Sequence, residues 1–175
     1  FVMHVAKSGA IDWAVQAGGA LDDTGLGIAH DGAGGALVTG TFLGDAWFGP
    51  TLLKSRGGYD ASMRVRPDVF VMHVTASGTI DWAVQAGGTS NDQVSGIAYD
   101  GAGGALVTGG FSGDAWFGSM SLTSRGEYDV FVMHVTASGT IDWAVQAGGS
   151  YSDEGLGIAN DGVGGALVTG FFCGD

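Results

Sequence analysis

The sequence predicts an all-β protein, and three observations carry that prediction. Glycine supplies 35 of the 175 residues, whereas proline supplies only 2. Short runs rich in Val, Ile, Phe and Trp, which favour strands, lie between the glycines that tight turns use. Long stretches of the chain also recur almost unchanged, so the protein is built from a repeated unit.

Three blocks recur in the same order and define this repeat. Phe-Val-Met-His-Val occurs at 1–5, 70–74 and 131–135. Ile-Asp-Trp-Ala-Val-Gln-Ala-Gly-Gly occurs at 11–19, 80–88 and 141–149. Gly-Gly-Ala-Leu-Val-Thr-Gly occurs at 34–40, 103–109 and 164–170. We therefore treat the chain as a single segment made of three repeats, 1–69, 70–130 and 131–175.

The first repeat is longer than the second. Equivalent positions lie 69 residues apart between the first two repeats and 61 apart between the second and third. The extra residues fall in one place, 61–68, and the blocks on both sides stay in register, so we predict an inserted loop. The third repeat is shorter than the others, and we expect the chain to be a piece of a longer protein.

The first half of a repeat is predicted to be a β-hairpin. In the third repeat, 131–135 is a short β-prone run and 136–140 is a turn-forming cluster. The next segment, 141–147, alternates apolar and polar residues, which places its apolar side chains on one face of a strand. That face carries Ile141, Trp143 and Val145.

The second half is predicted to supply two more strands, 157–160 and 165–171, joined by a turn rich in Gly and Asp. Four strands in about 60 residues suit one blade of a β-propeller, whereas a β-helix needs a coil of roughly 20–30 residues. A β-sandwich is an alternative that does not require near-identical copies. The predicted fold is therefore an all-β partial propeller of about three repeats, with four-stranded antiparallel sheets as blades.

A longer pattern resembles a known repeat family. Asp-x-Phe-Val, followed by Ser-Gly-x-Ile-x-Trp-Ala-x-Gln-x-Gly-Gly, runs from Asp129 to Gly149. Asp-x-x-x-Gly-Ile-Ala-x-Asp spans 153–161, and Gly-Gly-x-x-Val-Thr-Gly-x-Phe begins at Gly164. This pattern resembles the SBBP-type bacterial β-propeller repeat. The resemblance implies an exported, secreted or cell-surface protein, and it brings no shared catalytic residues.

Propellers have about four to eight blades, so three repeats leave two sheet edges exposed, and exposed edges associate. The default interpretation is that other sequence completes the ring. The order of the hairpins allows an alternative, because the chain begins with the last hairpin of one blade and ends with the first hairpin of another. Two partial propellers would then self-associate into six blades.

The charge of the chain restricts its partners. With 18 acidic residues against 6 basic ones, the net charge is −12. Such a surface repels phosphate backbones and anionic lipids, so we expect no nucleic-acid binding. The chain has no apolar run near the roughly 18 residues of a membrane span, so we expect no membrane insertion. Its single cysteine, Cys173, excludes an intrachain disulfide.

Acidic residues that recur in every repeat are the candidate metal ligands. Loop carboxylates beside glycines suit Ca²⁺, which prefers oxygen ligands. The chain has no EF-hand pattern, and an Asp in a turn more commonly accepts hydrogen bonds from the local backbone. Both interpretations stay open, and no other cofactor is predicted. The Ca²⁺ candidates are Asp23, Asp31, Asp92, Asp100, Asp153 and Asp161.

Tryptophan and histidine also recur at fixed positions. Trp47 and Trp116 lie in glycine-flanked segments, where a partly exposed indole near a carboxylate suits sugar stacking, although packing between blades is the commoner use. The three equivalent histidines would bind metal only with further ligands, so we expect strand residues held by hydrogen bonds. They are His4, His73 and His134.

The sequence contains no nucleophile elbow and no HExxH or CxxC motif. Near-identical repeats also leave little room for a unique catalytic constellation, so we expect no enzyme activity. The leading hypothesis is a non-catalytic propeller scaffold that binds a protein or glycan partner. The alternative is a carbohydrate- or Ca²⁺-binding module with one site in each blade.

Overall fold

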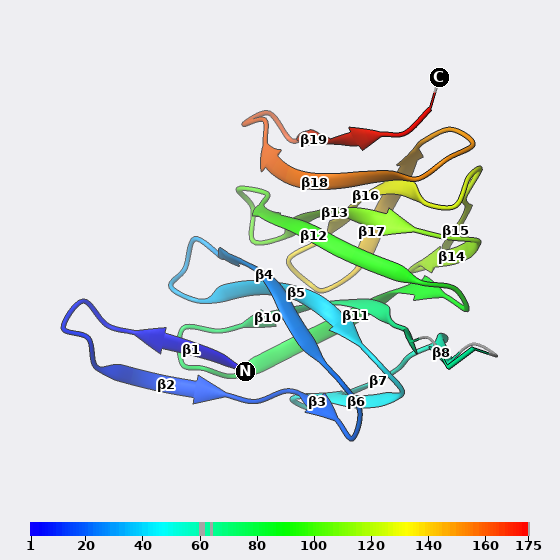
Figure 1. The fold of residues 1–175 in the computed structure, drawn as a ribbon. Helices are drawn as coiled ribbons and strands as arrows, with labels where there is room; N and C mark the ends of the chain where they lie inside the picture. The colour runs from blue at the N-terminus through cyan, green and yellow to red at the C-terminus, as the bar shows by residue number, and fades with distance from the viewer. Residues whose placement is uncertain (60–61, 64, 175) are drawn as a thin grey trace.

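The computed structural model describes residues 1–59, 62–63 and 65–174. In this part of the chain the regular structure consists of nineteen strands, β1 to β19, and no helix (Figure 1). The all-β prediction is therefore confirmed. Within the same residues there is no helix of the length and hydrophobicity needed to cross a bilayer.

The strands follow the repeats in order. The first repeat, with its insertion, contains β1 (Val2–Val5), β2 (Ile11–Val15), β3 (Gly18–Gly19), β4 (Thr24–His30), β5 (Ala36–Phe42), β6 (Asp45–Phe48), β7 (Thr51–Lys54), β8 (Gly58–Tyr59) and β9 (Val65–Arg66). The second contains β10 (Asp68–Val74), β11 (Ile80–Gly88), β12 (Asp92–Tyr99), β13 (Ala105–Phe111), β14 (Asp114–Phe117) and β15 (Met120–Thr123). The third contains β16 (Asp129–Val135), β17 (Ile141–Ala147), β18 (Asp153–Asn160) and β19 (Ala166–Phe172).

Two four-stranded antiparallel arrays form the centre of the molecule, in the orders β4-β5-β10-β11 and β12-β13-β16-β17. Each array combines the second hairpin of one repeat with the first hairpin of the next. The registers are equivalent, since Met72 opposes Val38 in the first array and Met133 opposes Val107 in the second. Every repeat is thus divided between two neighbouring sheets, and strand pairing ties successive copies together.

An outer hairpin extends the first array. β14 pairs with the end of β11, where Gly88 opposes Ala115, and β15 pairs with β14, so this sheet has six strands. In the first repeat the β6-β7 hairpin pairs with the glycines of β3 in the same way. A side chain at Gly88 would collide with the backbone carbonyl of Asp114, so glycine is required where these strands approach each other.

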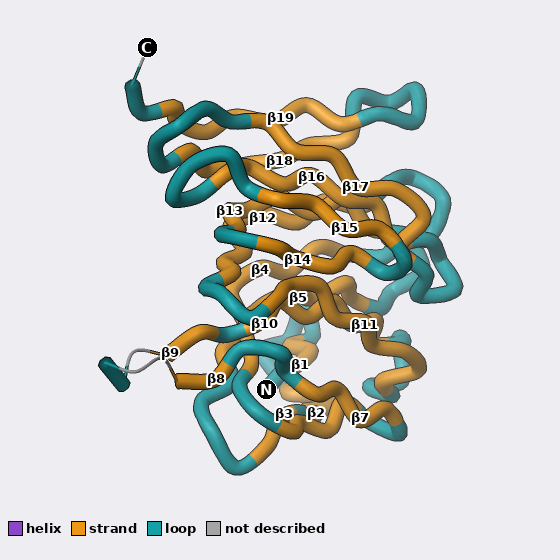
Figure 2. Tube along the Cα trace, turned by 90° about the vertical axis from the view of Figure 1, so that its right-hand side faces the viewer, coloured by secondary structure: helices purple, strands orange, loops and turns teal. Residues whose placement is uncertain are grey.

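The sheets stack on one another, and the two-stranded hairpins β1-β2 and β18-β19 lie toward the two ends of the stack (Figures 1 and 2). The edge strands β4, β12 and β18 follow one another across it. The Ile97 side chain of β12 lies against Gly27 of β4, and Ile158 of β18 lies against Gly96 of β12. Each of these glycines leaves the space that an isoleucine of the following sheet fills.

Two apolar clusters between the sheets form the core. One contains Phe42, Phe48 and Phe70, with the ring centroids of Phe48 and Phe70 only 4.6 Å apart. The other repeats the arrangement one unit further along the chain, with centroids of its central pair 5.2 Å apart, and contains Phe111, Phe117 and Phe131. Equivalent residues of successive repeats therefore build equivalent parts of the core.

In the structure the inserted residues lie one position earlier in the chain than the predicted segment 61–68. Asp68, which the alignment of the repeats places at the end of the segment 61–68, opens β10 and is fully buried, as Asp129 is at the start of β16. The extra residues therefore precede Asp68, and the short β8-β9 hairpin contains part of them. Residues 60, 61 and 64 of this segment lie outside the described part of the chain.

Candidate functional site

His73 joins the two hairpins of one sheet through two carboxylates. Its Nδ1 lies 2.7 Å from Oδ1 of Asp81 on the neighbouring strand β11. Its Nε2 lies 2.9 Å from Oδ2 of Asp31, in the turn between β4 and β5. Since Asp31 belongs to the first repeat and His73 to the second, this group of three side chains connects successive repeats. We call it the carboxylate clip.

The third repeat builds the same clip around His134, whose ring nitrogens lie 2.6 Å from Asp142 and 3.0 Å from Asp100. Partial burial disfavours the charged imidazole, but the hydrogen bonds with Asp100 and Asp142 outweigh it and raise the pKa of His134. Burial likewise opposes the charge of Asp100, yet its hydrogen bond with His134 and those from the backbone lower the pKa of this carboxyl.

The hydrogen bonds of the clip occupy both ring nitrogens of His73 and His134. A general base or a metal ligand needs a free imidazole lone pair, whereas both ring nitrogens of His73 and His134 face carboxylates. The geometry therefore favours a structural role. His4 has half a clip, because its Nδ1 lies 2.7 Å from Asp12 and the described residues supply no hydrogen-bond partner for its Nε2.

Three of the predicted Ca²⁺ ligands, Asp31, Asp100 and Asp161, cap the turns in which they lie. Oδ1 of Asp31 accepts the backbone N–H of Ala33 at 2.7 Å and that of Gly35 at 2.8 Å. The equivalent pair of bonds recurs at Asp100 and at Asp161. In each of these residues Oδ1 therefore accepts hydrogen bonds from the backbone of its own turn. In Asp31 and Asp100 the second oxygen, Oδ2, bonds to the histidine of the clip.

The other three candidates, Asp23, Asp92 and Asp153, hold the glycine pair that follows each Ile-Asp-Trp strand. Oδ2 of Asp92 accepts the N–H of Gly88 at 2.7 Å, and the equivalent bonds of Asp23 and Asp153 are both 2.6 Å long. Burial raises the pKa of Asp92 to about 7, and the nearby Asp68 carboxylate adds to the rise. Asp92 therefore holds a proton at higher pH than an exposed carboxyl does.

The structure does not bring the two sets of candidates together. Asp23 precedes β4 and Asp31 follows it, and the same separation recurs in the other repeats. Across residues 1–59, 62–63 and 65–174, no three His, Cys, Asp or Glu side chains are grouped so as to hold a metal ion.

Trp47 and Trp116 lie on the outer hairpins and are 55 % and 38 % exposed. The Arg56 guanidinium lies 5.8 Å from the ring centroid of Trp116, which is within cation–π range. Trp47 is thus the more open of the two flat surfaces, and the two rings remain candidates for stacking on a sugar.

Two of the other tryptophans, Trp13 and Trp82, connect neighbouring sheets. Nε1 of Trp13 donates to the carbonyl of Ala76 at 3.0 Å, and Nε1 of Trp82 donates to the carbonyl of Ala137 at 3.1 Å. Both rings are partly buried and pack against the core clusters. Trp13 and Trp82 therefore lie at the margin of the core, and each also bonds to the following repeat.

Comparison of the repeats with one another reveals a region where their sequences differ most, which the motifs did not indicate. Over the 45 positions that all three repeats share, seven carry a different residue in every copy. Six of the seven lie where β4, β12 and β18 begin or where β5, β13 and β19 end. We call this region the variable end. It comprises residues 20–22, 24, 41 and 43, their counterparts 89–91, 93, 110 and 112, and 150–152, 154, 171 and 173.

The variable end presents exposed apolar side chains and a cavity. Leu21, Tyr151 and Phe171 are 46 %, 57 % and 40 % exposed. A cavity of about 240 Å³ is lined by Gln93, Tyr128, Ser152, Asp153, Glu154 and Phe171. Small-molecule sites usually measure roughly 300–1,000 Å³, so this hollow suits one side chain or sugar unit of a larger partner.

No family model matches the sequence, and no curated protein matches it.

Proposed function

We propose that this chain is a non-catalytic β-propeller module that binds a protein or glycan partner at its variable end. The observation that carries the proposal is the position of the differences among the repeats. Residues that hold the fold, such as those of the clip and the core, must be the same in every copy. Residues that the fold does not require to be identical can differ between copies so as to contact a partner. Six of the seven fully variable positions lie together at one end of the sheets.

The propeller architecture rests on two features. Each array is an antiparallel sheet of four strands, as a propeller blade is. Each array also takes one hairpin from each of two successive repeats. The edge strands β4, β12 and β18 follow one another across the stack through equivalent isoleucine–glycine contacts. With the resemblance to SBBP-type repeats, these features favour a secreted or cell-surface scaffold.

A variant of the variable end tests the binding role. Gln93→Ala, Tyr151→Ala and Glu154→Ala together remove three of its side chains, and Val163→Ala provides the control, because Val163 is 90 % exposed in a turn at the opposite end of the strands. On a glycan array and an array of extracellular protein domains, we expect ligands of the wild type to lose binding at least tenfold to the triple variant alone. Equal binding by all three proteins contradicts the proposal.

The exposure of Trp47 favours a second candidate, carbohydrate binding at the outer hairpins. In that case Trp47→Ala and Trp116→Ala abolish glycan binding while the variable-end variant retains it. Calorimetric titration with Ca²⁺ tests the remaining alternative: heat that disappears in Asp92→Asn would favour a metal-dependent site.

A further inference from the structure

We propose that the β8-β9 hairpin, with the neighbouring side chains of Arg56 and Trp116, is a docking site for an acidic peptide segment of a partner protein. The hairpin lies between the first two repeats and contains part of the insertion, and Figure 2 shows β8 and β9 projecting from the stack of sheets. We call residues 56–59, 62–63 and 65–67, together with Trp116, the arm site. This site is separate from the variable end.

The stretch 56–66 is basic in an otherwise acidic chain. It contains three of the four arginines and one acidic residue, which gives it a charge of +2, whereas the remaining residues of the chain together carry −14. Its counterpart in the second repeat, 125–128, contains one arginine and one glutamate and is neutral. Complementary charges attract a partner and exclude partners of the wrong sign. The arm site therefore favours an acidic partner.

The hairpin also exposes large apolar side chains. Tyr59 opposes Val65 in the two-stranded ladder, so these side chains share one face, and they are 52 % and 48 % exposed. Met63 is 75 % exposed, and its φ of 59° makes it the one non-glycine residue with a positive φ in the described part of the chain. Methionine rarely adopts this conformation, and such strain is concentrated at active sites and ligand contacts. These side chains offer apolar contacts that a purely ionic partner would not use.

The next junction shows that the fold does not require Tyr59 on a projecting hairpin. Its counterpart Tyr128, where there is no insertion, is partly buried and accepts a hydrogen bond from the Asn91 side chain. The backbone carbonyl of Tyr128 accepts the first N–H of β18, and the carbonyl of Pro67 accepts the first N–H of β12 in the same way. Pro67 thus replaces the tyrosine in the body of the structure, and the insertion places Tyr59 outside it.

The base of the hairpin is fixed to the core. The buried carboxylate of Asp68 accepts the backbone N–H of Arg56 at 2.9 Å and that of Gly57 at 3.3 Å. A side chain at Gly57 would collide with the carbonyl oxygen of Arg66, so the chain segments approach closely there. A site that is held in place before binding loses less conformational freedom when a partner docks.

Arg56 places a positive charge next to the hairpin. Its guanidinium lies 5.8 Å from the ring centroid of Trp116, and the residue is exposed. Stacking on an aromatic ring restricts the rotamers of an arginine, while the N–H groups in the guanidinium plane can still bind a carboxylate in a bidentate manner. Arg56 is therefore the residue that holds a Glu or Asp side chain of the partner.

These features fit a short peptide better than a long polyanion. A peptide pairs its acidic side chains with Arg56 and packs its apolar side chains on Tyr59 and Val65, as segments that dock on exposed strands do. A nucleic acid or a sulfated polysaccharide would use the charges alone, and its length would bring it against the acidic remainder of the chain. The occupant of the arm site is therefore an acidic peptide segment.

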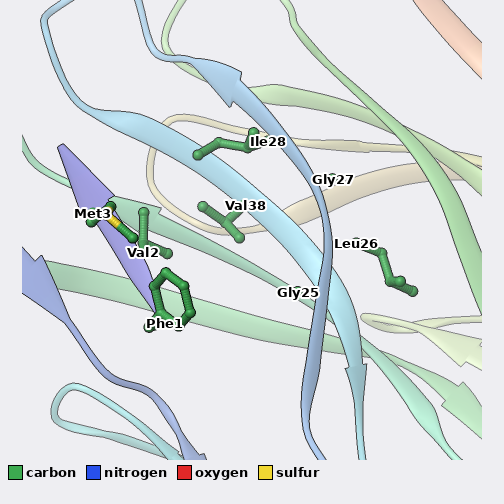
Figure 3. Close-up of a pocket in the computed structure, with 8 residues that line it drawn as sticks. All are labelled: Phe1, Val2, Met3, Gly25, Leu26, Gly27, Ile28 and Val38. Atoms are coloured by element: carbon green, nitrogen blue, oxygen red, sulfur yellow. The ribbon is translucent and has the colours of Figure 1, made fainter. Parts of the chain in front are cut away.

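The hollow between β1 and β4 does not suit the same partner. It measures about 280 Å³, and Figure 3 shows the eight residues that line it, none of which has a charged side chain. Such a surface would leave the carboxylates of the peptide unpaired. It does provide an apolar control residue, because Leu26 lines the hollow and is 54 % exposed.

Peptide arrays test the charge of the arm site. One array carries peptides of about twelve residues that mix Asp and Glu with Leu, Val and Phe, and in a second array Lys replaces every acidic residue. The wild type should bind members of the first array only, and Arg56→Glu should weaken this binding at least tenfold. Lys7→Glu is the matched control, because it changes the net charge equally at an exposed residue outside the site, and it should bind like the wild type.

Deletion of the insertion tests the hairpin as a whole. Removal of 60–67 joins Tyr59 to Asp68 as Tyr128 is joined to Asp129, so the second repeat already contains the resulting junction. We expect the deletion variant to keep the circular dichroism spectrum of the wild type and to bind the acidic peptides at least tenfold more weakly.

A point substitution keeps the test decisive if the deletion variant does not fold. Met63→Asp replaces a strained methionine by a residue that tolerates the left-handed region, so it should fold and should also weaken peptide binding. Leu26→Asp makes the same chemical change in the apolar hollow and should leave peptide binding unchanged. Equal losses in the two variants overturn the proposal.

Three further results would overturn it. They are a wild type that binds none of the acidic peptides, an equal loss in Arg56→Glu and Lys7→Glu, and tighter binding of heparin than of any peptide. The variant Tyr151→Ala with Glu154→Ala separates this site from the variable end, and it should bind the acidic peptides like the wild type. A loss in that variant places the peptide at the variable end, which overturns the arm site and leaves the proposed function standing.

Discussion

Nε2 of His134 lies 3.0 Å from Oδ2 of Asp100, although 34 residues separate them in the sequence. Asp100 belongs to the second repeat and His134 to the third, so this pair connects the two hairpins of one sheet through side chains as well as through strand hydrogen bonds. The repeat thus encodes its own connection to the next copy: one residue in a turn, one on a strand and one on the neighbouring strand.

Removal of the central imidazole should destabilise the fold. We expect His134→Ala to lower the free energy of unfolding by about 1–3 kcal/mol, because Asp100 and Asp142 lose a charged hydrogen-bond partner. His30→Ala serves as a control, since His30 is an exposed histidine outside any clip, and we expect it to cost less than about 1 kcal/mol. Urea denaturation of the three proteins provides the measurement, and equal losses in the two variants would contradict a special role for the clip.

The contribution of His134 should depend on pH. Its pKa in the folded protein is raised above the ordinary value of 6.5 by hydrogen bonds that outweigh partial burial. A raised histidine pKa stabilises the fold fully below the unfolded pKa, and this stabilisation is lost as pH rises through the folded pKa. The difference in unfolding free energy between wild type and His134→Gln should therefore shrink from pH 5.5 to pH 8.5. A difference that grows with pH would refute the charged form of the clip.

Asp92 should oppose stability at high pH. Burial, with a further contribution from Asp68, raises its pKa from 3.8 to about 7, so between these values the folded state binds a proton that the unfolded state has released. Stability due to this group therefore falls as pH rises from about 4 to 7. Asp92→Asn should be more stable than wild type at pH 8, on the order of a few kcal/mol, and close to it near pH 4. Thermal unfolding at the two pH values measures the effect, and a variant less stable at pH 8 would contradict it.

Much of the fold could be predicted because the repeat shows the same pattern three times. The alternating segment 141–147 coincides with β17, and its hairpin with β16 was also predicted correctly. The prediction that Ile141 and Trp143 share one face was wrong, because a bulge sets Ile141 opposite Val135 and Trp143 opposite His134, on opposite faces of the sheet. The strand predicted at 157–160 was too short, since β18 begins at Asp153. A bulge between Gly155 and Gly157 shifts the register there, and the glycines beside it hide the first half of the strand, because glycine is depleted in regular strands.

The candidate site was harder to predict, because its contacts depend on strand register. Asp31 and His73 are 42 residues apart, and neither motif spacing nor composition relates them before β5 and β10 are paired. The position of the insertion was hard to predict for the same reason. In the sequence, Asp60 and Asp68 match Asp129 equally well, and the burial of Asp68 identifies it as the equivalent residue. The variable end was visible in the sequence, but only by comparing the copies position by position.

Two opposed glycines provide the sharpest test of the strand packing. Gly25 of β4 and Gly40 of β5 face each other in the register, yet their surroundings differ. A Cβ at Gly40 would collide with the backbone carbonyl of Thr24 and would lie 2.8 Å from the Phe70 ring, whereas a Cβ at Gly25 would have no atom within 4 Å. We expect Gly40→Ala to lower the free energy of unfolding by about 1–3 kcal/mol or more.

Gly25→Ala is the matched control, and the second repeat already carries Val94 at the equivalent position. Because its backbone is not in the left-handed region, alanine should restrict the unfolded chain and change stability by about +0.4 to +1 kcal/mol. Urea unfolding of both variants measures the pair. If Gly40→Ala were tolerated as well as Gly25→Ala, the two strands could not approach as closely as the bulge beside Gly25 requires, and the register that aligns every clip in the chain would have to be different.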